Sequence, residues 1–403
     1  MRMSGRWGVD GEVGLDQHAR TVAESTSMDR YRRGCRCARF RVRPARGVPA
    51  SARDRSCDME GGGGASTDDA PTMMADTRTH TVAFDAGIML DRCAAERRNP
   101  RLVESLRTDP RTQWVHLRGD TAAVRTAVDG RPSLLSGPLA GHDGPALFLG
   151  RNTDGIATIA VLDPGDDAGE NADHAAAGGA PAVDGTQGPE ITWAGLRDIG
   201  PSLSALDVDR FMTALALSSW HARHPRCPRC GQPTTIELAG WIRRCQADGS
   251  EHYPRTDPAV IVAITDPGDR LLLARAPAWP RGRRSVLAGF VEPGEHLEWA
   301  VAREVHEEVG VTVDDITYVD SQPWPFPASL MLGFRARTDD PALRLDPGEI
   351  AEAEWYTRKG LRDAVAGERL LLPGRLSIAR RLVEGWFGER IDPPKEVSFH
   401  RPS

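Results

Sequence analysis

The sequence predicts an α/β protein of two or three domains, and three observations support this prediction. The chain has 403 residues, more than a single hydrophobic core usually organises. Short apolar runs typical of β-strands recur in both halves of the chain, separated by Gly, Pro and Asp turns. Other stretches carry apolar residues at i, i+3, i+4 and i+7, which is the period of an amphipathic helix. Strands mixed with helices in this way indicate a layered α/β sandwich.

Composition and charge argue against several classes of protein. Hydrophobic residues make up 40% of the chain and charged residues 27%, as in an ordinary soluble globular protein. The net charge of -6 argues against a protein built chiefly to coat nucleic acid. No apolar run approaches the roughly 20 residues of a membrane span, so we expect no membrane partner. The seven cysteines lack the spacing of a disulfide framework, and we therefore expect a cytoplasmic location.

Residues 1–76 are arginine-rich and glycine-rich and show no apolar periodicity. We expect a disordered tail, or a start codon assigned too far upstream with Met59, Met73 or Met74 as the true initiator. A basic arm that binds nucleic acid and an organellar targeting segment are the alternative interpretations.

Residues 77–222 are expected to form a β-rich N-terminal domain. Strands are predicted at 81–84, 114–117, 146–150 and 156–162. A Gly/Ala/Asp-rich segment at 164–189 is expected to be a surface loop. Ser204 and Asp207 then predict the start of a helix through a capping interaction. One apolar face of this helix is formed, through about residue 220, by Val208, Phe211, Met212 and Leu215.

Residues 223–256 have the cysteine spacing of a zinc ribbon, except at its last position. A full ribbon would end with a cysteine at position 248, where this chain has Asp248. Because Zn²⁺ accepts carboxylate oxygen and imidazole as well as thiolate, Asp248 or His252 could complete a tetrahedral structural site. The candidate ligands are Cys227, Cys230, Cys245 and Asp248. The alternative is a ribbon without metal, held together by packing alone.

Residues 257–395 contain an acidic segment, Gly289 to Val311, that reads GFVEPGEHLEWAVAREVHEEVGV. On a helix Glu304, Glu307 and Glu308 fall at i, i+3 and i+4, so all three lie on one face. Three like charges on one face repel each other unless a cation binds between them. Hard Mg²⁺ prefers oxygen ligands and often bridges carboxylates to substrate phosphates. The segment therefore predicts a metal site that acts on a phosphate.

A second motif, SQPWPFPAS at 321–329, follows the acidic helix. Its alternate prolines remove N–H donors and exclude a central strand, while Trp324 and Phe326 are placed to stack on a flat ring. The alternative is a loop that only fills the edge of a core. Strands are predicted at 259–264, 270–275, 316–320 and 329–336. An acidic segment at 349–356 and a last amphipathic helix at 376–387 follow them.

These motifs together resemble a known family. The acidic segment matches G-x5-E-x7-R-E-U-x-E-E-x-G-U, with U an apolar residue, which is similar to the signature of Nudix hydrolases. With SQPWPFPAS downstream and a zinc ribbon upstream, the chain resembles the NADH pyrophosphatase, or NudC-type, Nudix hydrolases from about Arg197 to its C-terminus. The resemblance implies a Nudix α/β/α sandwich that hydrolyses the diphosphate of NADH or NAD⁺ to nicotinamide mononucleotide and AMP. It also implies removal of NAD caps from RNA 5′ ends, a homodimer, and a need for Mg²⁺ or Mn²⁺.

The resemblance also implies roles for individual residues. The implied metal ligands are the Ala288 carbonyl, Glu304, Glu308 and Glu349, and the implied catalytic base is Glu307 or Glu308. The implied substrate-binding residues are Arg197, Tyr253, Phe290, Gln322, Pro323, Trp324, Pro325, Phe326, Pro327, Ala328, Ser329 and Ala379. Phe290 and Tyr253 would sandwich the adenine, with the tyrosine supplied by the other subunit. The chain departs from the family pattern at Asp248 and at Gly240, where some members have a glutamate that contacts substrate.

Two other functions are compatible with the Nudix motif. The chain could be a Nudix hydrolase for ADP-ribose or another nucleotide sugar, or a non-catalytic Nudix module that senses a ligand. The second motif argues against the first alternative, and the intact glutamates argue against the second.

Arg303 and Glu295 are expected to pair and fix the loop against the helix. A path for RNA is suggested only by the ribbon arginines, which could instead be merely solvated: Arg226, Arg229, Arg243 and Arg244.

Overall fold

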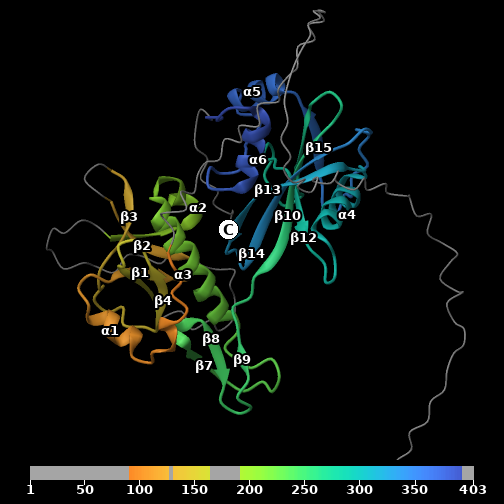
Figure 1. The fold of residues 1–403 in the computed structure, drawn as a ribbon. Helices are drawn as coiled ribbons and strands as arrows, with labels where there is room; N and C mark the ends of the chain where they lie inside the picture. Colours follow the sequence, from red (N-terminus) through yellow and green to blue (C-terminus); the bar gives the residue numbers. More distant parts are fainter. Residues whose placement is uncertain (1–89, 127–129, 164–190, 393–403) are drawn as a thin grey trace, which may run out of the picture. The chain divides into compact units, whose positions relative to one another are not determined.

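The structure, a computed structural model, describes residues 90–126, 130–163 and 191–392 (Figure 1). The predictions made for 1–76, 81–84 and 164–189 lie outside these described residues. In the described parts, helices alternate with three β-sheets, so the predicted α/β class is confirmed. Among the described helices, none combines the length and the apolar character needed to cross a membrane.

The N-terminal part is a six-stranded sheet with helices on both faces. Its strands are β1 Gln113–Arg118, β2 Thr121–Thr126, β3 Pro132–Leu134, β4 Ala146–Arg151, β5 Ala157–Leu162 and β6 Ile191–Gly195. They follow the order β3-β2-β1-β5-β4, with β6 paired to β2. Its helices are α1 Leu102–Thr108, α2 Leu196–Ile199 and α3 Ala205–Arg223. The strands predicted at 114–117, 146–150 and 156–162 are therefore confirmed as β1, β4 and β5.

Alternation along the strands explains how the two faces are covered. Trp114 of β1 packs in the cluster formed with α1, whereas Val115 and Leu117 pack in the cluster formed with α3. The Oγ of Ser204 accepts a hydrogen bond of 3.1 Å from the backbone N–H of Asp207, so the predicted cap is confirmed. The four residues predicted to form the apolar face of α3 are buried, namely Val208, Phe211, Met212 and Leu215.

The ribbon is a small antiparallel sheet formed by β7 Thr234–Glu237, β8 Ile242–Cys245 and β9 Glu251–His252. It is tied to the N-terminal sheet by a hydrogen bond of 2.7 Å from the indole N–H of Trp241 to the carbonyl of Phe148. The guanidinium of Arg97 stacks on the same indole, 3.6 Å from the centroid of the ring. These contacts hold the ribbon against the N-terminal sheet.

The C-terminal part is a second six-stranded sheet. Its strands are β10 Asp257–Thr265, β11 Leu271–Arg275, β12 Leu287–Phe290, β13 Asp314–Trp324, β14 Ser329–Arg337 and β15 Glu352–Tyr356. They follow the order β13-β14-β10-β11-β15, with β12 paired to β10. Its helices are α4 Leu297–Val309, α5 Arg358–Ala366 and α6 Ile378–Phe387. All the strands predicted in this region, and the last helix, are present.

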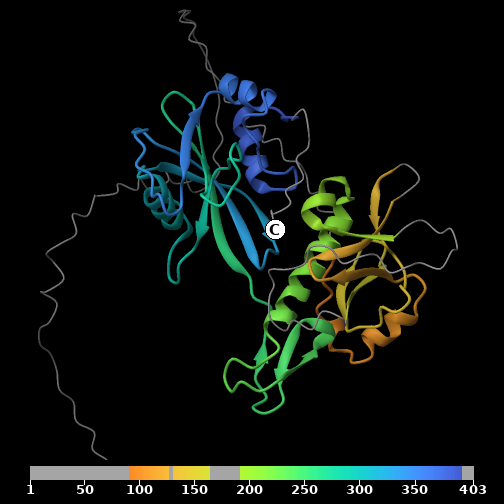
Figure 2. The same cartoon turned by 180° about the vertical axis from the view of Figure 1, so that it is seen from behind.

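The two faces of this second sheet are covered by different helices, as Figures 1 and 2 show. Along β10, Val260, Val262 and Ile264 pack against α4, whereas Ile261 and Ala263 pack against α5 and α6. Side chains of successive strand residues point to opposite faces, so one apolar strand can serve both helical layers. The predicted α/β/α sandwich is confirmed.

The proline-rich motif lies at the edge of this sheet. Strand β13 pairs only with β14 in the strand order, and it continues through Pro323 to Trp324 before the chain turns at 325–328. An edge strand tolerates proline because one side of it makes no ladder hydrogen bonds. The expectation that the motif is not a central strand is confirmed, but β13 extends further than the predicted 316–320.

Candidate active site

The acidic face of α4 lies against β12, and glycine makes this approach possible. A Cβ at position 289 would lie 1.9 Å from the Cδ of Glu304, so a larger residue there would displace the glutamate. Helix α4 ends at Gly310, whose φ of 70° is the left-handed conformation that glycine favours. Glycine is therefore required for structural reasons at both positions of the motif, Gly289 and Gly310.

Glu308 is the most buried carboxylate of this face. Its side chain is 8% exposed, and its Oε2 atom has no hydrogen-bond partner. Burial, with the nearby charges of Glu304, Glu349 and Glu307 added, raises its pKa to about 8. A buried oxygen without a donor, surrounded by further carboxylates, fits a hard divalent cation such as Mg²⁺ or Mn²⁺. The residues present therefore fit the metal that the resemblance implies.

Arg303 organises the carboxylates around this site. It donates to the Glu295 carboxylate at 2.8 Å, which confirms the predicted pair, and to the carbonyl of Phe290 at 2.9 Å. The same guanidinium also donates to Glu304 at 2.9 Å and to Glu307 at 3.0 Å. These last two contacts were not predicted from the sequence, although the i, i+4 spacing of Arg303 and Glu307 could have indicated one of them.

The register of the sheet brings the two sequence motifs to one end of the structure. Ala259 of β10 pairs with Phe290 of β12 on one side and with Met331 of β14 on the other. Met331 in turn pairs with Gln322 of β13. Phe290 and Gln322 therefore stand three strand spacings apart, about 14 Å at about 4.8 Å per spacing. Such a span suits a dinucleotide whose two ends are held by different loops.

The aromatic side chains of the second motif contact the N-terminal part of the chain. The rings of Trp324 and Phe326 meet edge to face, with centroids 5.0 Å apart. The guanidinium of Arg197, on α2, lies 4.0 Å from the centroid of the Phe326 ring and 5.6 Å from that of Trp324. The structure thus brings Arg197 to the proline-rich loop, a contact that was not predicted from the sequence; its role toward a substrate stays a prediction.

Two residues for which substrate contact was predicted are internal. The side chain of Gln322 is buried, accepts a hydrogen bond of 2.6 Å from the N–H of Ile378, and donates one of 2.6 Å to the carbonyl of Leu376. The side chain of Ala379 packs in the core beneath α6. The amide of Gln322 therefore fixes the start of α6 against β13, a structural role that was not predicted from the sequence.

The two aromatic residues expected to sandwich adenine are both exposed. Tyr253 is 63% exposed and Phe290 58%, and the hydroxyl of Tyr253 donates to Glu251 at 2.6 Å. Gly240 has a φ of 100°, and a Cβ there would lie 2.7 Å from Cδ2 of Leu147. The chain therefore has no room at position 240 for the glutamate that some family members have.

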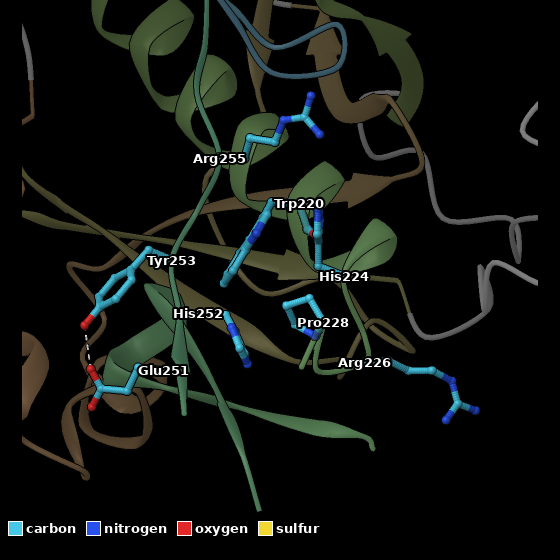
Figure 3. Close-up of a pocket in the computed structure, with 8 residues that line it drawn as sticks. All are labelled: Trp220, His224, Arg226, Pro228, Glu251, His252, Tyr253 and Arg255. Atoms are coloured by element: carbon cyan, nitrogen blue, oxygen red, sulfur yellow. Dashed lines mark hydrogen bonds between the residues drawn. The ribbon is translucent and has the colours of Figure 1, made fainter. Parts of the chain in front are cut away.

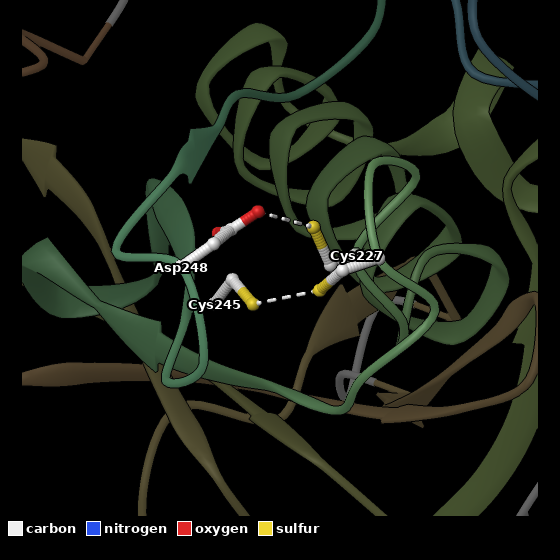
Figure 4. Close-up of side chains that lie close together, drawn as sticks. Cys227, Cys245 and Asp248 are labelled. Atoms are coloured by element: carbon white, nitrogen blue, oxygen red, sulfur yellow. Dashed lines mark hydrogen bonds between the residues drawn. The ribbon is translucent and has the colours of Figure 1, made fainter. Parts of the chain in front are cut away.

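Four side chains of the ribbon form a compact group of metal-type donors (Figure 4). One ligand atom from each lies within 4.8 Å of all the others, and the residues are Cys227, Cys230, Cys245 and Asp248. The group includes Asp248 and not His252, whose Nε2 lies 3.1 Å from the Oγ of Ser250.

The protonation of two of these donors, Cys227 and Asp248, suits a cation, whereas burial raises the pKa of the Cys245 thiol to about 11. Burial raises the pKa of the Cys227 thiol, but hydrogen bonds from Ser250 and from the N–H groups of Arg229 and Cys230 outweigh it and bring the pKa to about 6. Hydrogen bonds to Ser250 hold the pKa of Asp248 well below its usual range. Three sulfurs and one carboxylate oxygen at this spacing fit tetrahedral Zn²⁺.

Arg243, one of the ribbon arginines, is buried at the junction with α3. Its Nε donates to the hydroxyl of Thr234 at 2.6 Å, and its Nη1 lies 3.1 Å from Nδ1 of His221. The Nε2 of His221 lies 2.9 Å from the carbonyl of Gly240 and must donate to it. The His221 ring therefore carries its proton on Nε2 and is neutral. Burial, with the charge of Arg243 added, lowers the pKa of His221 to about 4.

This histidine predicts a pH dependence of stability. Between pH 6.5 and about 4 the unfolded chain binds a proton at His221 that the folded chain does not. The free energy of unfolding therefore decreases as the pH is lowered through that window. We expect it to lose about 3 kcal/mol there. The variant His221→Gln, which keeps one donor and one acceptor, should lack that part of the pH slope in urea titrations. An identical slope in the variant would contradict this assignment.

Comparisons with known proteins agree with this organisation. The NUDIX domain family matches residues 255–373, and the NADH pyrophosphatase zinc ribbon domain matches residues 222–253. The chain is 46% identical over 200 residues to the NAD-capped RNA hydrolase NudC of Mycobacterium bovis (strain BCG / Pasteur 1173P2), covering 47% of this chain and 64% of that protein. It is 41% identical over 212 residues to the NudC of Stutzerimonas stutzeri (strain A1501), covering 52% and 72%. The chain belongs to the NudC-type family of Nudix hydrolases.

A similar protein is also found in an animal. The chain is 40% identical over 192 residues to the NAD-capped RNA hydrolase NUDT12 of Macaca fascicularis, covering 45% of this chain and 41% of that protein. The match with the first of the bacterial relatives spans 64% of that protein's length. The NudC-type combination of zinc ribbon and Nudix domain thus lies within residues 222–373, the part that also contains the acidic site and the proline-rich loop.

Proposed function

We propose that this NudC-type chain hydrolyses the diphosphate of NADH and NAD⁺ to nicotinamide mononucleotide and AMP, and removes NAD caps from RNA. The observation that carries this proposal is the sheet register, which sets the loop after β13 and the acidic face of α4 at the same end of β10. The relatives named for hydrolysis of NAD-capped RNA support the same substrate class.

The residues of this chain prepare the site for attack by water. A bound Mg²⁺ or Mn²⁺ would supply positive charge to the diphosphate oxygens. Glu304, Glu308, Glu349 and the Ala288 carbonyl are the proposed ligands. Arg303 holds Glu304 and Glu307 in place, so the carboxylates are oriented before substrate arrives. Glu307 or Glu308 would take the proton from the attacking water.

The dinucleotide would be held by the loop residues Pro323 to Ser329, by Arg197 and by Phe290. Phe290 and Tyr253 are exposed, which supports a site in which each ring stacks on the adenine, the tyrosine being supplied by a second subunit of a homodimer.

The compact donor group supports a structural Zn²⁺ in the ribbon. Free cysteines in the described residues support a cytoplasmic location. We propose domain boundaries at 77–222, 223–256 and 257–395.

Product analysis with four substrates tests the proposal. The purified protein with Mg²⁺ or Mn²⁺ is incubated with NADH, NAD⁺, ADP-ribose and NAD-capped RNA, and the products are separated by chromatography and mass spectrometry. We expect reduced nicotinamide mononucleotide and AMP from NADH, with kcat/KM at least about tenfold above that for ADP-ribose. Preference for ADP-ribose would favour a nucleotide-sugar hydrolase. Absence of product from all four substrates would favour a ligand sensor.

A further inference from the structure

A row of oppositely charged side chains crosses the three strands of the ribbon. Arg244 of β8 bonds Glu237 of β7 on one side and Glu251 of β9 on the other, and it is the strand partner of Glu251 in the sheet. Its Nε donates to Oε2 of Glu237 at 2.8 Å, and its Nη2 donates to Oε1 of Glu251 at 2.6 Å. Arg244 therefore fixes the carboxylate of Glu251 through one of its two oxygens.

The second oxygen of this carboxylate holds Tyr253. The hydroxyl of Tyr253 donates to Oε2 of Glu251 at 2.6 Å, and Figure 3 shows the hydroxyl directed toward this carboxylate. The hydrogen bonds from Tyr253 and from Arg244 hold the pKa of Glu251 below its usual range, so the hydroxyl donates to an ionised acceptor at neutral pH. Hydrogen bonds of this charge-assisted kind are shorter and stronger than those between neutral groups.

Tyr253 stands at the surface, where packing restricts its side chain little, because the residue is 63% exposed. It follows β9 directly and precedes Pro254, whose ring favours extended conformations for the backbone of Tyr253. The torsions of the side chain remain to be fixed. An exposed side chain that becomes ordered only when a ligand binds weakens the affinity by about two- to tenfold, and a bond that orders it beforehand removes that loss.

We propose that Glu251, held by Arg244, is a positioning residue that orders the Tyr253 ring for stacking on the adenine bound by the other subunit. This inference rests on the proposed function and its homodimer, and extends them to residues that touch no substrate. All members of the row lie in one ribbon together with the tyrosine, so they serve a single site, the one that this tyrosine completes. Arg244, considered from the sequence as part of a path for RNA, thus acquires a different role.

A double-mutant cycle with the hydroxyl tests the proposal. In Glu251→Ala we expect KM for NADH to rise about threefold or more with kcat within about twofold of wild type, because stacking on adenine stabilises the ground state and the transition state alike. In the background Tyr253→Phe, which keeps the ring without the hydroxyl, the same substitution should change KM by less than about 1.5-fold. An unchanged KM in Glu251→Ala, or equal factors in both backgrounds, would overturn the proposal.

Controls separate positioning of the tyrosine from support of the ribbon. Glu251 is exposed, so Glu251→Ala should keep the zinc content and the unfolding temperature of the wild type. Glu298→Gln, which changes an exposed carboxylate of α4 outside the ribbon, should keep both kcat and KM. Loss of zinc together with a fall in kcat in Glu251→Ala would identify a structural role and overturn the proposal.

Mixed dimers show which site the residue serves. Subunits carrying Glu251→Ala and subunits carrying Glu308→Gln are co-expressed with different tags, and the heterodimers are purified. Their one active site then combines an intact Glu308 with the intact ribbon of the partner subunit. We expect its KM for NADH to equal that of the wild type, whereas Glu251→Ala homodimers keep the raised KM. A raised KM in the heterodimer, or a chain that forms no dimer, would overturn the proposal.

Binding of AMP separates this inference from the proposed function, because it requires no turnover. The full chain is titrated with AMP by isothermal calorimetry. We expect Glu251→Ala to weaken AMP binding about threefold or more, and to weaken it by less than about 1.5-fold in the Tyr253→Phe background. Unchanged affinity in Glu251→Ala would overturn the inference. AMP binding that depends on Glu251 in this way, without hydrolysis of NADH by the wild type, would refute only the proposed function.

Discussion

Replacement of Glu308 by Gln is expected to lower kcat for NADH by about 10³-fold or more. The side chain is buried, one oxygen has no hydrogen-bond partner, and the amide removes the negative charge that a divalent cation would need. The fold should tolerate the change, because Gln has nearly the same shape and brings no charge into a buried position. Steady-state rates with NADH and thermal unfolding in EDTA give the two readouts.

Two further variants on the same helix make this result interpretable. Glu298→Gln, in the first turn of α4 and outside the acidic motif face, should keep full activity. Glu307→Gln changes an exposed carboxylate that Arg303 holds at 3.0 Å. If Glu307 is the base, the variant should lose activity as severely as Glu308→Gln; if not, the loss should be much smaller. A Glu308→Gln enzyme with more than about a tenth of the wild-type rate would contradict the role of this residue.

The α/β/α sandwich and the contact within the acidic motif could be predicted because they depend on patterns of neighbouring residues. Strand β10 is a continuous apolar run, as expected for a strand covered on both faces, and α4 ends at a glycine in the left-handed conformation. The contact of Arg303 with Glu295 could be predicted because both belong to one short motif. Each of these features depends on residues close together in the sequence.

Contacts between distant segments could not be predicted in the same way. The amide of Gln322 bonds the start of α6, which is 56 residues further along the chain at Ile378. The small hollow beside the proline-rich loop is lined by Arg223, Arg255 and Ala328, which no spacing rule connects. Arg243 looked like a surface cation because arginine is usually exposed, yet His221 and Thr234 supply its partners inside the protein. Such residues acquire their roles only when the fold brings their partners to them.

Loss of the ribbon metal should have the largest effect on stability. We expect the purified chain to carry about one equivalent of Zn²⁺, and Cys245→Ser to lose it, because Cys245 is a buried member of the donor group. Zinc binding contributes about 10–16 kcal/mol to the folding of isolated zinc-finger peptides. Here we expect a loss of about 5 kcal/mol, since Trp241 and Arg243 also hold the ribbon by hydrogen bonds. Metal analysis and denaturant unfolding measure both effects.

The fourth donor provides the sharper comparison. Asp248→Cys restores three thiolates and adds a fourth, so it should retain Zn²⁺ longer than wild type against a chelator, whereas Asp248→Asn should release it faster. Cys93→Ser removes a half-buried free cysteine of the N-terminal part and should change neither metal content nor stability. Equal chelator half-times for the wild type, Asp248→Cys and Asp248→Asn would show that the carboxylate is not a ligand. In that case the closeness of Asp248 to the three sulfurs would reflect only its hydrogen bonds to Ser250.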